Sequence, residues 1–384
     1  MEITKKIAII FLTFQLVFLF SSRITTSASD ISIKAPSAVL MESSTGKILF
    51  EKNSHEKRAC GALTKIMSLL LISEAIDNNK ISMDDTITVG DCVSSVTGAH
   101  VWLRPGEQIT VKDLVKSIAI ASANDATLAI AHSLAGSEEN FVSQMQKKAE
   151  EIGMKDTVFK NCNGIEQEGH LSSANDIAIV SQNLLKHPEI CDLTSIWMDT
   201  IREGKTQIVN SNVLVKNKEY GITGIKSGTT KEAGSCVSAT ANRDNLSLVC
   251  VVLGGQTGKD RFEDALKVFD FGFNNYKTID AEPPSEGFPL VKVIGGMKST
   301  VEVEMDPNQN IVVEAGQTKQ IVSEVVLPES LEAPVEIGQK VGEITYQESN
   351  HKDLAKFPIF ISEKIEKLSF GSSLSSLFES LIKM

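Results

Sequence analysis

One segment restricts the fold of this chain more than any other, because its apolar residues occupy every face of the helix it would form. Between Lys65 and Ile76 the apolar positions are Ile66, Met67, Leu69, Leu70, Leu71, Ile72, Ala75 and Ile76. A surface helix has a single apolar stripe, whereas a helix that is apolar all round is enclosed by protein. We therefore expect a helix that begins near Ala62 and lies in the centre of a domain.

The apolar pattern changes along the chain from alternating to helical and back to alternating. The expected elements are strands at 38–41 and 47–51, a helix that begins near Ala62 and continues to Ile76, helices at 111–121, 126–136 and 138–152, strands at 235–241 and 246–253, and a helix at 261–276. Early strands, central helices and late strands predict an α+β domain over residues 35–278, with an antiparallel sheet shared by its two ends and a helical region between them.

A second domain is predicted after the first. Pro283-Pro284-Ser285 is typical of a linker, and the run Val301–Met305 alternates between apolar and polar residues. Three further runs, at 311–313, 322–327 and 343–346, repeat this strand pattern. We expect a small all-β domain over residues 285–350.

The two ends of the chain have patterns of their own. Residues 1–28 are typical of an export signal. They contain Lys5 and Lys6, then an apolar run from Ile7 to Phe20 that is short for a membrane span, and then small residues up to Ala28. We expect cleavage there, with an uncleaved anchor as the alternative. The mature chain would lie at the outer face of the cytoplasmic membrane or in the cell wall. The apolar pattern of residues 365–384 predicts an amphipathic helix. This helix would lie on a membrane surface or, as an equally favoured alternative, pack on its own domain.

Composition excludes several classes of protein. The formal net charge of −11 argues against nucleic acid as a partner, and the hydrophobic content of 42% excludes a disordered chain. Six cysteines are few for this length, so no disulfide framework is expected. The sequence has neither a CxxC pair nor an HExxH spacing, and we predict no metal site and no cofactor.

Lys65 is the first candidate for chemistry. A nucleophile at a helix N-terminus has backbone N–H groups beside it to stabilise an oxyanion, and a lysine one turn later lies on the same face and can take its proton. Burial of Lys65 in its apolar helix would lower the pKa of its amine towards that of a base. The alternative is a lysine that extends from the first turn into water. The nucleophile position itself holds Ala62, whose methyl group cannot attack a carbonyl.

Two further short motifs follow in the chain, Ser122-Ala123-Asn124 and Lys226-Ser227-Gly228. Each is weak alone, since Ser-Ala-Asn-Asp occurs again at residues 173–176. Two other Ser-x-x-Lys matches, at residues 44–47 and 54–57, lie in a predicted turn and a charged loop, so we discount both as nucleophile sites. Order and context make the three motifs much stronger together than apart.

Across nearly its whole length the chain resembles the D-alanyl-D-alanine carboxypeptidase branch of the penicillin-binding proteins, a serine peptidase family with SxxK, SxN and KTG motifs. The segments that carry the resemblance are Ala35 to Met41, Ser122 to Ala126, Asn163-Gly164-Ile165 with His170, and Gly224 to Thr230 with Glu232-Ala233-Gly234. The resemblance implies a β-lactamase-like peptidase domain and action on the D-Ala-D-Ala ends of peptidoglycan stem peptides.

The resemblance also implies roles for the first two motifs. Lys65 would be the general base for acylation, and Ser122 would relay a proton to the leaving D-alanine. Asn124 would hold the substrate peptide. The backbone N–H groups of Ala62 and Thr229 would form the oxyanion hole.

For the third motif the implied roles concern the substrate. Lys226 would tune the electrostatics of the site, and Ser227 would bind the terminal carboxylate with Gly228 beside it. Arg261 falls where the family has an arginine that assists carboxylate binding. His170 would support a loop rather than take part in the reaction.

Ala62 is the departure from the family pattern, which has serine there. Cys60 and Thr64 are displaced from the required position, since two residues turn a helical side chain by roughly 200°. Ser68 would lie one turn deeper in the core. None of these three residues is expected to replace the missing nucleophile, because attack geometry tolerates only small displacements.

We therefore predict a catalytically impaired member of the family that recognises D-Ala-D-Ala ends and binds β-lactams without a covalent bond. One alternative is an active serine D,D-carboxypeptidase of cell-wall synthesis, which requires Ser at position 62 in the working protein or another nucleophile. A further alternative is a scaffold whose β domain binds partners.

Overall fold

The computed structural model describes residues 31–307, 309–316, 321–349 and 352–369. The chain divides into two units, residues 1–33 and residues 34–384, and almost all of the described structure belongs to the second. The predicted export signal and residues 370–384 of the predicted terminal helix lie outside the described residues. Within the described ranges, no helix has the length and apolar character needed to cross a membrane.

A five-stranded sheet joins early and late parts of the chain, as the alternating patterns predict. Its strands are β1 (Ser37–Glu42), β2 (Ile48–Lys52), β7 (Ile222–Thr230), β8 (Gly234–Arg243) and β9 (Leu246–Gly255). The order is β2-β1-β9-β8-β7, and every neighbouring pair is antiparallel. In this sheet β7 is an edge strand, so one row of its backbone N–H and C=O groups is left for other partners.

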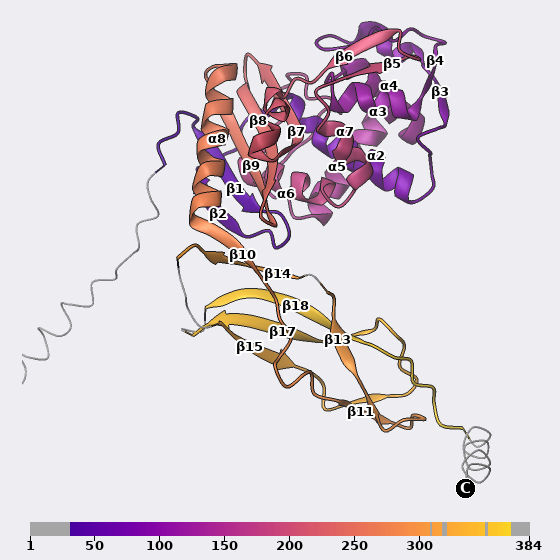
Figure 1. The fold of residues 1–384 in the computed structure, drawn as a ribbon. Helices are drawn as coiled ribbons and strands as arrows, with labels where there is room; N and C mark the ends of the chain where they lie inside the picture. Colours follow the sequence, from indigo (N-terminus) through magenta and orange to yellow (C-terminus); the bar gives the residue numbers. More distant parts are fainter. Residues whose placement is uncertain (1–30, 308, 317–320, 350–351, 370–384) are drawn as a thin grey trace, which may run out of the picture. The chain divides into compact units, whose positions relative to one another are not determined.

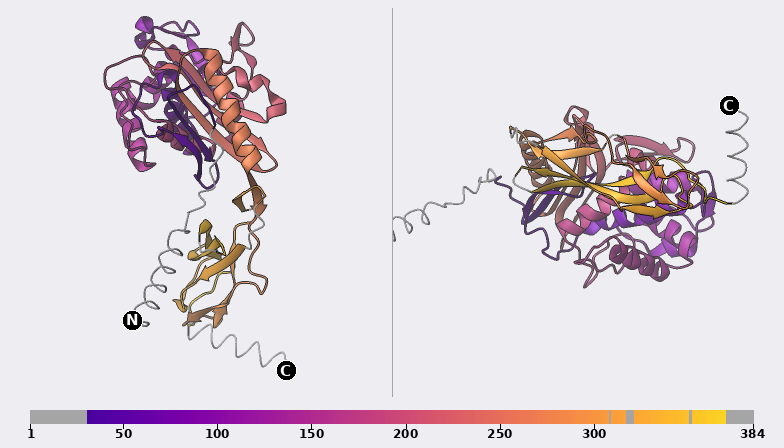
Figure 2. Two further views of the ribbon diagram at one scale, coloured as in Figure 1. Left: turned by 90° about the vertical axis from the view of Figure 1, so that its left-hand side faces the viewer. Right: turned by 90° about the horizontal axis from the view of Figure 1, so that it is seen from below.

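Helices cover both faces of this sheet (Figures 1 and 2). Helix α8 (Gly258–Asn275) packs on β8 and β9. A Cβ atom on Gly272 of α8 would lie 2.7 Å from side-chain carbons of Leu40 and Leu248, so the backbones approach closely there. Val39 and Val249 point the other way, because side chains alternate along a strand, and they join the core beneath α6 (Ala174–Leu184).

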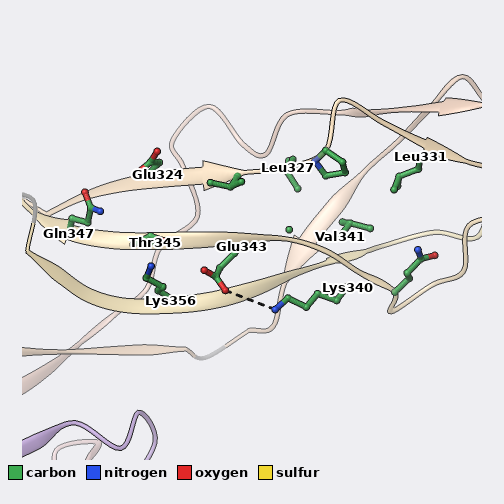
Figure 3. Close-up of a pocket in the computed structure, with 13 residues that line it drawn as sticks. Glu324, Leu327, Leu331, Lys340, Val341, Glu343, Thr345, Gln347 and Lys356 are labelled. Carbon is green, nitrogen blue, oxygen red and sulfur yellow. Dashed lines mark ion pairs between the residues drawn. The ribbon is translucent and has the colours of Figure 1, made fainter.

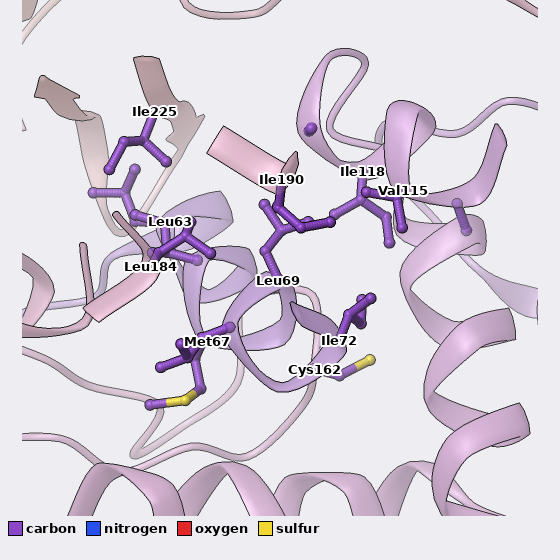
Figure 4. Close-up of a cluster of buried hydrophobic side chains, with 14 of the residues drawn as sticks. Leu63, Met67, Leu69, Ile72, Val115, Ile118, Cys162, Leu184, Ile190 and Ile225 are labelled. Atoms are coloured by element: carbon purple, nitrogen blue, oxygen red, sulfur yellow. The ribbon is translucent and has the colours of Figure 1, made fainter. Parts of the chain in front are cut away.

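Helix α2 (Lys65–Asp77) lies in the centre of the helical region, as its apolar faces predict (Figure 4). Around it are α3 (Val111–Ala119), α4 (Asn124–Ala135), α5 (Glu138–Glu151), α6 and α7 (Pro188–Thr194). The α-helix starts later than predicted, because Gly61–Thr64 form a 3₁₀ turn, η1, that follows a positive φ of 53° at Gly61. Ala62 therefore lies on a tight turn before the α-helix.

Smaller elements connect these helices and strands. Two ribbons pair β3 (Thr86–Thr88) with β4 (Gln108–Thr110) and β5 (Met198–Ile201) with β6 (Thr206–Val209). Three short 3₁₀ turns are η2 (Asp91–Ser95), η3 (Val213–Lys216) and η4 (Lys218–Tyr220). Thr110 caps α3, since its hydroxyl accepts a hydrogen bond from the Asp113 N–H.

The later part of the chain consists of strands with a core of their own. They are β10 (Tyr276–Asp280), β11 (Val291–Ile294), β12 (Thr300–Val301), β13 (Val303–Met305), β14 (Asn310–Glu314), β15 (Ile321–Val326), β16 (Ser330–Glu332), β17 (Lys340–Glu348) and β18 (Asp353–Ile361). The sheet orders are β13-β18-β17-β15, β12-β11-β16 and β10-β14. The predicted strand 301–305 is interrupted at Glu302, after which the chain leaves β11 and pairs with β18.

Candidate active site

The three motifs meet in one cleft of about 470 Å³ beside the β7 edge. Of the predicted site residues, those that line this cleft are Ala62, Lys65, Ser122, Asn124, Ser227, Gly228 and Thr229. The rest of the lining comes from residues 97–99, Ala121, residues 163–166, Ser211, Thr230 and Lys231. Two predicted site residues are not in this lining: Lys226, on β7, donates to Ala119 O, and Arg261, on α8, donates to the backbone of β7.

Two glycines fix the position of Ala62. A Cβ atom on Gly164 would lie only 1.9 Å from the carbonyl oxygen of Gly61, and Gly164 has a φ of 79° that favours glycine. Across the cleft, a Cβ atom on Gly228 would lie 2.7 Å from the Cβ atom of Ala62 and 3.0 Å from its nitrogen. Only glycines permit these two backbone segments to approach the turn so closely.

Lys65 is buried, with 1% of its surface exposed, yet it borders the cleft. Its Nζ donates a hydrogen bond of 2.5 Å to the carbonyl oxygen of Asn163. Burial lowers the pKa of Lys65 to about 7, although negative charge on Cys162, Asp125 or Cys60 would favour the ammonium form. A large fraction of the amine is therefore neutral near pH 7 and able to accept a proton.

Ser122 differs in conformation and surroundings from Ser173 in the repeat at residues 173–176. Ser173 is in an extended conformation before α6, and its hydroxyl accepts a hydrogen bond from the Asp176 N–H, an ordinary helix cap. Ser122 has a φ of 60°, which is uncommon for a residue with a side chain, and α4 has no side-chain cap. The Ser122 hydroxyl borders the cleft without a hydrogen-bond partner among the described residues.

Asn124 and Asp125, at the start of α4, hold the loop that forms the opposite rim of the cleft. The Asn124 side-chain nitrogen donates to Thr97 O at 2.6 Å, and its backbone N–H donates to Ala99 O at 2.7 Å. The Asp125 carboxylate accepts hydrogen bonds from the backbone N–H groups of Val101 and Leu103. One N–H of the Asn124 side chain is therefore engaged within the protein, which leaves its second N–H and its carbonyl oxygen for a substrate.

Lys226, on β7, is completely buried and donates a hydrogen bond to Ala119 O at 3.2 Å. Burial, with a smaller contribution from the charge of Lys65, lowers the pKa of Lys226 well below its ordinary value. The neighbouring Ser227 hydroxyl donates to Ser211 O at 2.7 Å. This bond ties β7 to the segment that carries Ser211, a cleft residue that the motifs do not reveal.

Arg261 acts on the cleft through β7. From α8, its Nη1 donates to Gly228 O at 2.6 Å and to the Thr229 hydroxyl at 2.7 Å. Its Nε is buried and has no hydrogen-bond partner among the described residues. The cation therefore lies directly behind Gly228 and Thr229 of β7.

The hydroxyl and thiol groups nearest Ala62 are occupied. His170 accepts a hydrogen bond from the Lys160 N–H at Nδ1, so its proton is on Nε2, which donates to the Thr64 hydroxyl at 2.8 Å. Burial lowers the pKa of His170 to about 4, so the imidazole stays neutral and holds the loop. Cys60 is fully buried against Thr64, and burial raises the pKa of its thiol. Ser68 donates to Cys162 O at 2.6 Å, below the cleft floor.

Glu166 is another cleft residue that the motifs do not assign. Its carboxylate accepts a hydrogen bond of 2.6 Å from the Glu232 N–H. This N–H and the Thr230 hydroxyl lower the pKa of Glu166. The bond closes the loop 163–166 against the turn that follows β7. In the sequence, only the preceding segment Asn163-Gly164-Ile165 indicated that this loop belongs to the site.

A larger groove, of about 820 Å³, lies on strands β15, β17 and β18 (Figure 3). Its charged residues are Glu324, Lys340, Glu343 and Lys356, and Lys340 forms an ion pair of 4.0 Å with Glu343. Among its lining residues the groove has no buried lysine, since Lys340 and Lys356 are both exposed. The larger volume of the groove therefore does not identify it as the active site, and the chemical groups around Ala62 favour the smaller cleft.

Comparisons with known proteins agree with this geometry. Residues 24–257 match the family model of D-alanyl-D-alanine carboxypeptidase, and residues 282–367 match the C-terminal domain of penicillin-binding protein 5. The chain is 38% identical to the D-alanyl-D-alanine carboxypeptidase DacF of Bacillus subtilis over 346 residues, which cover 89% of this chain and 88% of DacF.

Solved structures give the same result. Penicillin-binding protein 5 of Haemophilus influenzae superposes with a TM-score of 0.75 at 28% identity, covering 88% of this chain and 99% of that one. Penicillin-binding protein D2 of Listeria monocytogenes, solved with ampicillin bound, superposes with a TM-score of 0.58 at 28% identity, covering 64% and 99%. Sequence and fold together show that the chain belongs to the D-alanyl-D-alanine carboxypeptidase family of penicillin-binding proteins.

Proposed function

We propose that this chain, as its sequence stands, is a receptor for D-Ala-D-Ala ends of peptidoglycan peptides that binds them without forming an acyl-enzyme. One observation carries the proposal: the nucleophile position holds the methyl group of Ala62, whereas the surrounding base, hydroxyl and strand are retained. Loss of a catalytic serine costs about 10⁶-fold in turnover, far more than any remaining group supplies.

Binding does not need the missing oxygen. The terminal carboxylate would lie against Ser227 and Thr229, with the Arg261 guanidinium behind them at hydrogen-bond distance from Thr229. The peptide carbonyl would point at the N–H groups of Ala62 and Thr229, since the first N–H groups of a helical turn have no partner within it. Asn124 would hold the peptide on the far side through its carbonyl oxygen.

An active peptidase is the second candidate, and one observation favours it. The Ser122 hydroxyl borders the same cleft as Lys65 and has no hydrogen-bond partner among the described residues. If any hydroxyl replaces the missing nucleophile, the geometry favours Ser122 over the occupied Thr64 and Ser68.

Residues 1–28 and 365–384 would serve the location of the receptor. The first would direct export, and the second would hold the mature chain on the outer face of the membrane. The peptidase-like part over residues 35–278 would then face the cell wall, with the all-β part over residues 285–350 connecting it to the terminal helix. A β-lactam would occupy the cleft without a covalent bond.

Calorimetric titration tests the receptor directly. We expect saturable, reversible binding of an N-acyl-D-Ala-D-Ala peptide and no binding of the matched D-Ala-L-Ala peptide. An Ala62→Leu variant is the control, because its larger side chain would fill the space beside Gly228 and remove the binding. Equal heats for the two peptides, or unchanged binding by the variant, would contradict the proposal. Release of D-alanine during the titration would instead favour the active peptidase.

A further inference from the structure

Strand β15 is one edge of the four-stranded sheet β13-β18-β17-β15, and no strand in the described part of the chain pairs with its outer side. One row of its backbone N–H and C=O groups is therefore left without a strand partner. Such a row is a template for another chain, and folded proteins usually shorten or bend an edge strand, or place lysine or proline on it. The other edge of this sheet follows that rule, since β13 has only three residues.

β15 lacks these protections. It has six residues, with no lysine, arginine or proline among them. Its pairing with β17 runs over all six residues without a bulge. Every residue of the strand is at least partly exposed, and Val322 and Val326 are exposed by 42% and 59%. A long, regular edge with exposed valines is the pattern of a surface that another strand covers.

The same strand borders the groove of about 820 Å³ (Figure 3). Glu324 and Val326 line this groove, together with Thr345 and Glu343, which are their partners on β17. Beyond the end of β15, the apolar residues of the lining are Leu327, Pro328 and Leu331. A strand added beside β15 would place alternate side chains on this face, next to the groove.

Glu324 determines which side chains such a strand needs. Val322, Glu324 and Val326 are alternate residues of β15, so they project from the same face. Glu324 forms no ion pair with any described residue, whereas the two lysines of the groove are each paired with another carboxylate. Asp353 makes the largest contribution that raises the pKa of Lys356, and Glu324 makes a smaller one. A carboxylate between two exposed valines therefore awaits a cation.

A second copy of this chain matches the edge poorly. If two copies paired through β15 with Val322 opposite Val326, the two Glu324 carboxylates would face each other, and like charges directly opposite are destabilising. A strand with lysine or arginine at this position has the opposite effect, because an opposite-charge pair across two strands contributes about 0.2–1 kcal/mol. Charge complementarity therefore favours a different chain as the occupant.

We propose that the outer edge of β15 is a docking site for an extended segment of a partner protein. The segment adds to the sheet as a fifth strand and places a lysine or arginine opposite Glu324, with apolar residues opposite Val322 and Val326. Backbone hydrogen bonds to β15 supply affinity, and the alternate side chains supply specificity. No residue of the cleft at Ala62 takes part, so the site does not depend on the proposed function.

Two fluorescent heptapeptides test the site on the full chain. One alternates threonine and valine with lysine at its centre, Thr-Val-Thr-Lys-Thr-Val-Thr, and the matched control has glutamate in place of lysine. Anisotropy should show saturable binding of the lysine peptide, about fivefold tighter than that of the control. Hydrogen exchange should slow at residues 321–326 when the lysine peptide is bound. Glu324→Lys, a change at an exposed position, should reverse the preference between the two peptides.

A second control tests the backbone pairing. Methylation of alternate amide nitrogens of the lysine peptide removes either the N–H groups that face β15 or those that face away from it. One methylated peptide should therefore lose binding, and the other should retain it.

Several results would overturn the proposal. They are the absence of binding up to millimolar concentration, equal affinity for the lysine and glutamate peptides, an unchanged preference in Glu324→Lys, and equal binding of the two methylated peptides. Exchange protection that omits residues 321–326 would place the peptide elsewhere and would also overturn it. A dimer in sedimentation that Val326→Lys dissociates would show that a second copy covers the edge, against the proposal.

Discussion

Replacement of Lys65 by Met should stabilise the protein at neutral pH, because the fold keeps an amine in a buried place. The pKa of Lys65 falls from 10.5 to about 7 on folding. At 1.36 kcal/mol for each pKa unit, burial of this group costs about 4 kcal/mol at pH 7. Met fills a similar length of the helix but leaves Asn163 O without its donor, a loss of about 1–3 kcal/mol. The expected net gain in the free energy of unfolding is about 2 kcal/mol.

The pH dependence gives this prediction its test. Between pH 7 and pH 9 the unfolded chain holds a proton on Lys65 and the folded chain does not. The stability of the parent therefore rises with pH, whereas the Met variant lacks this contribution. The advantage of the variant should shrink by up to about 1.4 kcal/mol per pH unit over this window. Lys226 is present in both chains, but the Met variant removes the contribution of the Lys65 charge to its lowered pKa, so the titration of Lys226 cancels only in part.

Urea unfolding of the two chains at pH 7, 8 and 9 measures the difference, with tryptophan emission as the signal. Both tryptophans lie in the peptidase-like part, so the signal reports on that part of the chain. A difference that is constant across this pH range would refute the reasoning, because Lys65 would then titrate alike in the folded and unfolded chains. A less stable variant at every pH would show that the bond to Asn163 outweighs the burial.

Three further predictions concern the cleft. The Ala62→Ser variant should be labelled covalently by fluorescent penicillin. The labelling rate should rise with pH up to about 7 and then level off, because only neutral Lys65 takes the serine proton. A labelling rate that does not change with pH would exclude Lys65 as the base. Gly164→Ala should lower the free energy of unfolding by about 3 kcal/mol, since the added Cβ would lie 1.9 Å from the carbonyl oxygen of Gly61. An unchanged urea midpoint of unfolding would contradict this close contact. Asp125→Asn should lower the free energy of unfolding by about 1–3 kcal/mol and shift the emission of Trp102, because the loop that carries Trp102 loses a charged hydrogen-bond acceptor. Identical emission spectra and stability in the two chains would mean that the Asp125 carboxylate does not hold this loop.

Periodicity predicted the fold well where burial dictates the pattern. Helix α2 is apolar on all faces because it is enclosed on all faces, and the paired strands β8 and β9, which are buried on both faces, flank a polar turn. The start of α2 was less predictable, since the 3₁₀ turn at Gly61–Thr64 depends on a positive φ and on contacts with loop 163–166. The interruption at Glu302 likewise depends on strand pairing between distant segments.

The site was predictable as far as its motifs extend. Lys65, Ser122 and Ser227 line one cleft as the motifs suggest, but Ser122 and Ser173 are each followed by Ala-Asn-Asp and have different backbone conformations. Tertiary contacts decide that difference, and local sequence does not record them.

The central claim is that Ala62 leaves a binding cleft without a nucleophile. Intact-mass spectrometry after incubation with benzylpenicillin tests it most directly, with the Ala62→Ser variant as the positive control. The account predicts no added mass on the unmodified chain and one penicilloyl group on the variant, mapped to residue 62. A penicilloyl adduct on the unmodified chain would contradict the account, and peptide mapping would show whether Ser122 supplies the missing oxygen.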